Sequence, residues 1–113
     1  MPTFEPGTVV RVPFPYTNRP VHQYRPAVVV SAPAFNARAH LLWVVMVTSA
    51  ENRRWPDDIS LEADFQSVGL PAPSLIRPAK IATIEAAQAE PVGHLPPDRL
   101  SLLLAAIAAI LPL

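Results

Sequence analysis

An arginine and a threonine stand at the ends of two apolar segments, where their side chains could hold a phosphate group. Arg25 opens the run Arg-Pro-Ala-Val-Val-Val-Ser after a polar stretch, and Thr48 follows the apolar residues 40–47. A guanidinium matches phosphate geometry with two parallel hydrogen bonds, and a hydroxyl can hold a phosphate oxygen. The same side chains could instead form an ion pair with a carboxylate and cap a turn. The residue types alone leave both interpretations open.

A histidine close to the arginine is the candidate for proton transfer. His22 lies three residues before Arg25, and an imidazole with its ordinary pKa of about 6.5 suits a general base. A histidine in a loop can also simply be solvated. The three histidines are separated by 18 and 54 residues and the chain has no cysteine, so no zinc-binding spacing is present. The adjacent carboxylates Asp57 and Asp58 are interpreted as a solvated turn rather than a magnesium site, and we expect no metal and no cofactor.

Length and composition limit the class of protein. The chain has 113 residues, enough for a single domain over residues 1–113, and half of them are hydrophobic. The N-terminal residues lack the basic region and the apolar run of a secretory signal. The apolar stretch Leu100–Leu111 is shorter than the roughly 20 residues that a membrane span needs. We therefore expect a cytoplasmic protein without a membrane partner.

The charges are unevenly distributed although the formal net charge is zero. Residues 1–54 hold six basic and two acidic side chains, whereas residues 55–113 hold three basic and seven acidic ones. A polarised molecule can present a basic face to phosphates and stay neutral overall. Halves of a sequence need not be faces of a molecule, so this interpretation stays open.

Prolines divide the chain into short segments. The chain has 15 prolines and three glycines, and proline is excluded from the interior of helices and of central strands. Apolar, β-branched runs between turn residues then predict strands, and the run of residues 40–47 is predicted to be a central strand with Trp43 in the core. The expected strands are Thr8–Val12, Pro26–Ser31, His40–Val47, Asp58–Leu61, and either two strands or one bent strand over Ser74–Ile76 and Lys80–Ile84.

Loops and one helix complete the predicted architecture. Residues 16–24 and 51–56 are predicted to be exposed loops, and residues 33–39 a connector. Pro97 suits the first position of a helix that runs to about Leu111, with Asp98 in its first turn. We expect a mainly β fold, in which a curled antiparallel sheet closes as a small barrel with the C-terminal helix packed on it.

That helix is apolar on nearly every side. A helix of this kind must be covered all round, and one sheet face in so small a domain covers about half of it. A disordered helix end is the alternative. We expect a second copy of the chain to cover the remainder in a homodimer.

Five sequence motifs, in order, resemble the MazF/PemK family of bacterial toxins. Each motif is short, but together they extend over nearly the whole chain. They are the opening strand and turn Gly7–Thr17, the Arg-Pro element Arg25–Ser31, the pair Thr48-Ser49, the block Gly69–Ile81, and Gly93-His94-Leu95 before the proline-started helix.

The resemblance implies a fold, an activity and partners. It implies an SH3-like barrel that forms a homodimer and cuts single-stranded RNA without a metal ion. It also implies the role of toxin in a type II toxin–antitoxin pair, with a cognate antitoxin protein that covers the RNA groove. Operator DNA is expected as a partner only for the complex with the antitoxin. The family's catalytic arginine and threonine correspond to Arg25 and Thr48, and His22 is added as the candidate base.

Aromatic and basic residues interleave in the polar stretches and are candidates for contacts with RNA. Flat rings can stack on unstacked bases, and cations can bind phosphates. The rings could instead pack on the barrel, and Arg77 could pair with an acidic residue. The candidate RNA-binding residues are Tyr16, Arg19, Tyr24, Ser49, Arg53, Arg54, Trp55, Arg77 and Lys80.

Two other functions fit the same fold. One is a barrel toxin of the CcdB type, which acts on a protein target without catalysis. The other is a catalytically dead module that binds only its antitoxin and operator DNA. Loss of Arg25 or Thr48 would leave the toxicity of the first intact, which separates it from a nuclease.

Overall fold

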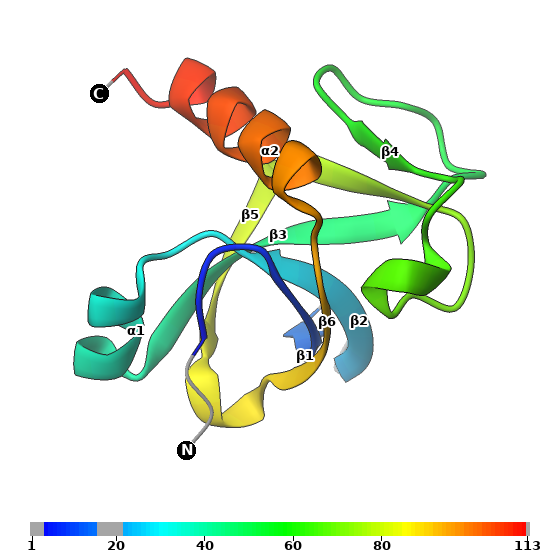
Figure 1. Cartoon of the computed structure of the whole chain (residues 1–113). Coiled ribbons are helices and arrows are strands. Elements are labelled where there is room, and N and C mark those ends of the chain that lie inside the picture. The colour runs from blue at the N-terminus through cyan, green and yellow to red at the C-terminus, as the bar shows by residue number, and fades with distance from the viewer. Residues whose placement is uncertain (1–3, 16–21, 113) are drawn as a thin grey trace.

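The computed structural model describes residues 4–15 and 22–112, without the side chains of residues 14, 15, 22 and 23. The described chain forms one antiparallel sheet, two α-helices and two short 3₁₀ helices (Figure 1). The elements are β1 (Thr8–Pro15), β2 (His22–Val29), α1 (Pro33–Ala39), β3 (Leu41–Ser49), β4 (Ile59–Leu61), η1 (Gln66–Val68), β5 (Ser74–Glu85), η2 (Ala86–Gln88), β6 (Glu90–His94) and α2 (Pro97–Ile110).

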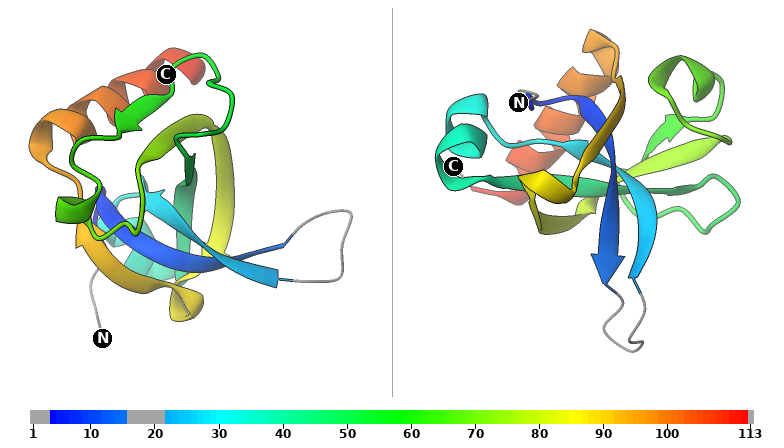
Figure 2. Two further views of the ribbon diagram at one scale, coloured as in Figure 1. Left: turned by 90° about the vertical axis from the view of Figure 1, so that its right-hand side faces the viewer. Right: turned by 90° about the horizontal axis from the view of Figure 1, so that it is seen from below.

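The sheet is curled, and its strands follow the order β4-β5-β3-β2-β1-β6. All of its described pairs are antiparallel, with Val9 opposite Val28 and Ala27 opposite Met46. The outer ends of β1 and β2 project from the rest of the sheet (Figure 2). This architecture confirms the predicted fold class, a mainly β fold of curled antiparallel strands with a C-terminal helix, and the sheet forms a half-barrel.

Apolar side chains on the two faces of the sheet form two separate cores. The helix-side core lies between the sheet and α2 and contains Val45, Val47 and Leu103, which are almost fully buried. The opposite core lies on the other face and contains Val44 and Met46. Because successive side chains of a strand point to opposite faces, β3 contributes to both cores, as its continuous apolar run predicted.

Trp43 was predicted to lie in the core, and this prediction is wrong. Alternation along β3 places it on the same face as Val45, but its side chain is 45% exposed. It contacts Phe35 of α1 edge-to-face, with ring centroids 6.1 Å apart. An apolar position in mid-strand predicts a core residue only where another layer covers it, and the packed part of α2 lies farther along β3.

Several segments differ from the elements predicted, and residues 13–15, which extend β1, are one of them. Residues 33–39 form α1 rather than a connector, with a proline in the first turn and His40 in the left-handed conformation at its end (φ 57°). Residues 22–24 belong to β2 rather than to a loop, and residues 90–94 form an unpredicted edge strand, β6. Short helices and edge strands carry few apolar positions, so their sequence pattern is weak.

β5 is one long strand with a bulge, which decides between the two predicted alternatives. Met46 of β3 pairs with Arg77 and the next β3 partner, Val45, pairs with Ile81. Residues 78–80 are therefore extra residues on β5, and they contain the proline that a regular central strand would exclude. The bulge bends the strand and places Lys80 at the bend.

Two backbone segments pack closely where the ends of the curled sheet approach each other. A Cβ atom on Gly93 of β6 would lie 2.1 Å from the carbonyl oxygen of Val68, and one on Gly69 would lie 2.2 Å from that of Val92. Gly69 also has a φ of +86°, which favours glycine. The described edge strands β4 and β6 do not pair with each other. The two ends of the curled sheet are instead connected by this backbone contact between β6 and the end of η1.

α2 covers the helix-side core with one stripe. Leu103 is fully buried, while Leu100 and Ile107 are partly buried against the same core. The flanks of this stripe stay open, since Leu102 is 55% and Ile110 is 49% exposed. The helix begins at Pro97 with Asp98 in its first turn, as predicted. Among the described residues, the helices are too short or too polar to cross a membrane.

Candidate active site

A cleft of about 230 Å³ brings together the two side chains that the sequence singled out for phosphate binding. Arg25 and Thr48 both line it, and both are partly buried rather than enclosed. Cationic, hydroxyl and amide groups dominate its polar lining. The lining residues are Arg25, Met46, Val47, Thr48, Asn52, Arg77 and Lys80.

Three neighbouring strands carry the cleft. Arg25 lies on β2, two residues before the pair that joins β2 to β3 at Ala27 and Met46. Thr48 is the penultimate residue of β3 and pairs with Leu75 of β5. Lys80 comes from the bulge of β5 and is exposed. The site therefore depends on the register of the central strands, with Arg25 in the middle of β2, Thr48 near the end of β3 and Lys80 at the bulge of β5.

Asn52 also lines the cleft, although no motif in the sequence predicted a role for it. Its side-chain Nδ2 donates to the Oγ1 of Thr48 at 2.5 Å. Its backbone N–H donates to the carbonyl of Ser49 at 3.0 Å, which closes the turn after β3. In the sequence, an asparagine four residues beyond a strand end is an ordinary turn residue. The turn that folds residue 52 back onto position 48 is visible only in the structure.

A buried ion pair supports the loop next to the cleft. Nη2 of Arg77 lies 3.1 Å from Oδ2 of Asp58, and the two side chains are 9% and 1% exposed. The same nitrogen donates to the carbonyl of Arg53 at 2.7 Å, and the guanidinium lies 4.2 Å from the ring centre of Trp55. The Asp58 carboxylate also accepts from the N–H of Trp55 at 2.9 Å.

This ion pair corrects the interpretation of the two adjacent aspartates. Asp57 is exposed in a left-handed turn (φ 69°), but Asp58 is a buried partner of Arg77. Arg77 borders the cleft with its charge engaged by a carboxylate, which is the alternative left open for it. Within the described residues, no group of three or more acidic or histidine side chains could hold a metal ion.

The other predicted RNA contacts that the structure describes do not line the cleft. Tyr24 is 58% exposed, but alternation along β2 directs it to the face opposite Arg25, where Arg11 lies over its ring at 5.8 Å. Ser49, Arg53 and Arg54 are exposed beyond the end of β3, and Arg54 lies 3.7 Å from Glu62. Tyr16, Arg19 and the side chain of His22 lie outside the described residues.

The chemistry available in the cleft is binding and stabilisation of anionic oxygen. Arg25 and Lys80 bring positive charge, and Thr48 brings a hydroxyl that can donate. Among the described residues that line the cleft, none is a carboxylate or a histidine. The cleft, as far as it is described, suits a phosphodiester better than a cationic or apolar ligand.

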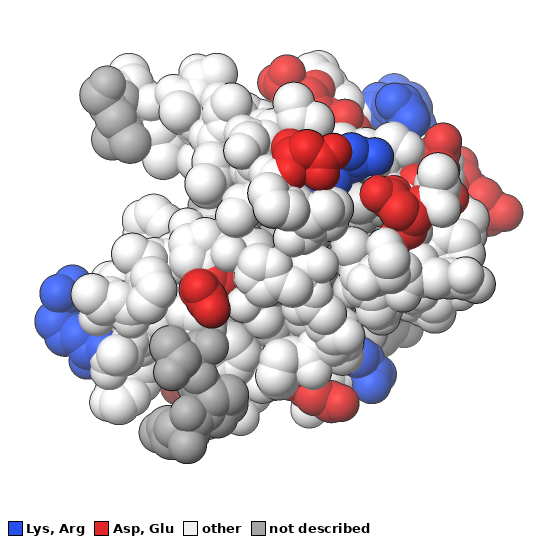
Figure 3. Space-filling view, viewed as in Figure 1, with Lys and Arg blue, Asp and Glu red and all other residues white. Residues whose placement is uncertain are grey.

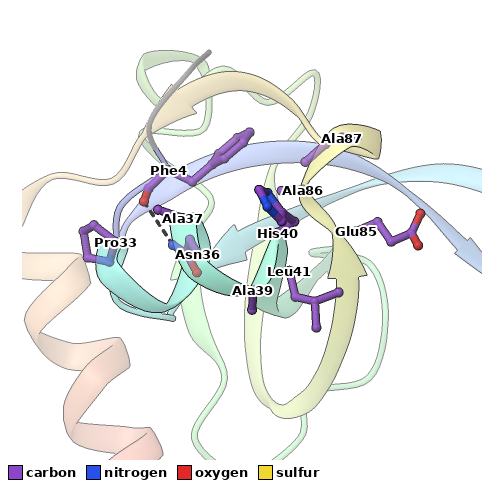
Figure 4. A pocket seen from close by; sticks show the side chains of 11 residues that line it. Phe4, Pro33, Asn36, Ala37, Ala39, His40, Leu41, Glu85, Ala86 and Ala87 are labelled. Carbon is purple, nitrogen blue, oxygen red and sulfur yellow. Dashed lines mark hydrogen bonds between the residues drawn. The ribbon is translucent and has the colours of Figure 1, made fainter.

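A larger cavity, of about 610 Å³, lies at the other end of the opposite core (Figure 4). Alanines, Phe4 and Leu41 form most of its wall, and His40 and Glu85 stand at its rim. The amide of Asn36 is already used, because it donates to the carbonyl of Phe4 at 3.0 Å. Its described lining has no arginine or lysine, so this cavity is not suited to phosphate.

Charged side chains gather over β4 and the first turn of α2, while much of the surface in the same view is uncharged (Figure 3). Arg99 lies 2.7 Å from Asp98 and 3.5 Å from Asp64, so the acidic side chains there are partly neutralised. The cations of the cleft come from other elements, β2 and β5. Of these cations, Arg25 belongs to the basic half of the sequence and Arg77 and Lys80 to the acidic half, so the cleft does not follow the uneven charge of the two halves.

Comparison with known families and structures gives one consistent result. The sequence model of the PemK-like, MazF-like toxins of type II toxin–antitoxin systems matches residues 5–111. A comparison with curated proteins finds no match.

Solved structures with the same fold are similar over the full chain. MazF from Deinococcus radiodurans has a TM-score of 0.79 at 21% identity, with 100% of both chains covered. MazE–MazF from the same organism has a TM-score of 0.78 at 20% identity, with 98% of both chains covered. An endoribonuclease in complex with its cognate antitoxin, from Mycobacterial species, has a TM-score of 0.75 at 19% identity, with 100% of this chain and 97% of that chain covered.

Proposed function

The chain belongs to the PemK-like, MazF-like toxin family of type II toxin–antitoxin systems, and from that membership we propose that it is an endoribonuclease that cuts single-stranded RNA without a metal ion. The observation that carries this proposal is the cleft, where Arg25 of β2 and Thr48 of β3 line one partly open space together with Lys80. A guanidinium and a hydroxyl side by side suit a phosphodiester.

In the proposed reaction, the 2′-hydroxyl of the RNA is the nucleophile. Its oxygen bonds to the adjacent phosphorus while the bond from phosphorus to the 5′-oxygen breaks, which leaves a 2′,3′-cyclic phosphate and a 5′-hydroxyl. A base takes the proton of the 2′-hydroxyl, and an acid gives a proton to the leaving oxygen. His22 is our candidate for this proton transfer, because an imidazole can act in both directions near neutral pH.

Arg25 and Thr48 act on the charge that builds up on the phosphate. In the crowded phosphorane, negative charge grows on the non-bridging oxygens, and donors that are already in place stabilise it most. Arg25 supplies two parallel N–H groups, and Thr48 supplies one O–H group. A guanidinium donates hydrogen bonds and has no acceptor, so we assign Arg25 charge stabilisation rather than base catalysis.

The flanking residues bind the rest of the RNA strand. Lys80 in the bulge contributes a cation next to the scissile phosphate, and Arg53 and Arg54 extend the cationic surface beyond β3. Ser49 and the aromatic candidates Tyr16, Tyr24 and Trp55 are proposed to hold bases, with Arg19 on a phosphate. Arg77 is proposed to support this surface through its contact with the loop.

The proposed partners are an antitoxin and a second copy of the chain. Related structures include MazE–MazF and an endoribonuclease with its cognate antitoxin, and a basic cleft suits an acidic antitoxin segment that competes with RNA. The exposed apolar flanks of α2 are proposed to meet in a homodimer. Operator DNA would bind only the complex with the antitoxin, and the protein would act in the cytoplasm.

Cleavage of a long RNA in the presence of EDTA tests the proposal. We expect discrete cuts that survive the chelator and end in 2′,3′-cyclic phosphates. Arg25→Ala should reduce the rate by about 100-fold or more, because a donor to the developing charge is lost. A 2′-deoxy nucleotide at the cut site should block cleavage there.

Two results would contradict the nuclease assignment. Random or absent cutting by the wild-type protein is one. Growth inhibition that persists unchanged in cells that produce Arg25→Ala is the other, and it would favour a toxin that acts on a protein target.

A further inference from the structure

We infer that Asn52 is a positioning residue that orients the hydroxyl of Thr48 as a donor into the cleft, an inference that rests on the proposed nuclease function. Nδ2 of Asn52 donates to Oγ1 of Thr48 at 2.5 Å, and both residues line the cleft. The role concerns the direction of one hydrogen atom rather than contact with the substrate.

A hydroxyl has one hydrogen and two lone pairs, so its partners decide which way it donates. When the amide N–H of Asn52 occupies a lone pair of Oγ1, the hydrogen of Thr48 must point elsewhere. The open direction is the cleft, where an anionic oxygen would accept it. A neighbour that accepts instead of donating would draw the same hydrogen away from the substrate.

The turn that carries Asn52 is held at several points. Its own N–H donates to the carbonyl of Ser49 at 3.0 Å, and the N–H of Ala50 donates to the carbonyl of Pro73 at 3.0 Å. On the other side, Arg77 donates to the carbonyl of Arg53 at 2.7 Å. The amide of Asn52 is therefore presented to Thr48 by a backbone that is fixed both before and after it.

Folding depends little on this amide. Asn52 is exposed, and the backbone of Thr48 is held by its pairing with Leu75 whatever residue occupies position 52. A substitution at position 52 therefore changes the direction of the hydroxyl without removing a buried contact.

Steady-state cleavage of a short fluorescent RNA by position-52 variants tests the inference. Asn52→Ala should lower kcat by about 3- to 10-fold and leave KM within about twofold, as for loss of one hydrogen bond that matters in the transition state. Asn52→Asp, which has the same size but accepts the hydroxyl hydrogen, should lower kcat further. In the Thr48→Val background, Asn52→Ala should have no additional effect, because the two residues act as one unit.

A second measurement on the full-length protein does not depend on activity. The side-chain amide of Asn52 should give a downfield, slowly exchanging NMR signal that moves to the free position in Thr48→Val. If the signal is that of a free amide in the wild type, or if the two substitutions are additive in kcat, the inference is wrong. If the wild type does not cut RNA while the Asn52 signal behaves as described, the proposed nuclease function fails and the hydrogen bond stands.

Discussion

Thr48 and Arg25 contribute different groups to the same cleft, and substitutions of Thr48 can separate its hydroxyl from its shape. Thr48→Val removes the O–H and keeps the branched side chain, so we expect kcat for RNA cleavage to fall by about 10- to 100-fold. Thr48→Ser keeps the donor and should retain most of the activity. The ratio of the two rates in the same assay measures the contribution of the hydroxyl. Equal rates for valine and serine would remove Thr48 from catalysis.

The sequence could predict the residues that border apolar runs and match a family motif, and it missed those whose contacts depend on a turn. Arg25 and Thr48 border apolar runs and match the family's Arg-Pro and Thr-Ser motifs, and both line the cleft. Asn52 and Asp58 were not selected for their observed contacts, because these arise only when the loop folds back on β3 and β5. No short-range pattern encodes that return.

One buried ion pair, between Asp58 and Arg77, holds the segment between β3 and β4 against β5. Asp58→Asn leaves the guanidinium of Arg77 buried without a carboxylate, which we expect to cost about 3 kcal/mol in the free energy of unfolding. Asp57→Asn is the matched control, because it replaces a carboxylate by an amide at the neighbouring exposed residue. Asparagine tolerates the left-handed backbone conformation of this position.

Urea denaturation of the two variants measures the difference. The midpoint should fall clearly for Asp58→Asn and stay close to the wild-type value for Asp57→Asn, at an unchanged slope. Equal midpoints for both would mean that the ion pair adds little to folding.

Among the helices and strands, those with a strong apolar pattern could be predicted from the sequence, and those with a weak pattern could not. β3 and α2 are long and apolar, and the structure confirms both. α1 has seven residues and β6 has five, so each offers few positions from which a period can be read. Pro33 and Pro91 also make these two elements hard to predict. Proline usually indicates a break in a helix or strand, although it is tolerated at the start of a helix and in an edge strand.

For the whole molecule, the exposed apolar flanks of α2 are the proposed dimer contact. We expect Ile110→Glu to convert a homodimer into a folded monomer, because a charge would be placed in the apolar contact. Gln88→Glu adds the same charge at an exposed position outside α2 and should leave the dimer intact. Sedimentation equilibrium of both variants gives their masses, and circular dichroism checks that each is folded. A wild-type protein that is monomeric at micromolar concentration would contradict the proposed dimer.

The overall fold was predictable because the strand-forming runs, the turns and the helix signals agreed with one another. Trp43 shows where that agreement ended, since burial on the outer part of a sheet depends on how far a covering helix extends. The length of α2 can be predicted from the sequence, but its placement over the sheet cannot, because packing at Leu103 and Ile107 determines it.

The three extra residues in β5 determine which face of the sheet the side chains after the bulge point to. In a regular strand, positions separated by an even number of residues share a face. Here Ile76 packs in the helix-side core and Ile84, eight positions later, packs in the opposite one. The odd number of inserted residues is what exchanges inside and outside between the two halves of the strand. Chain length at this site can therefore change only in steps of two, since a single insertion or deletion would turn every side chain from Ile81 onward to the wrong face.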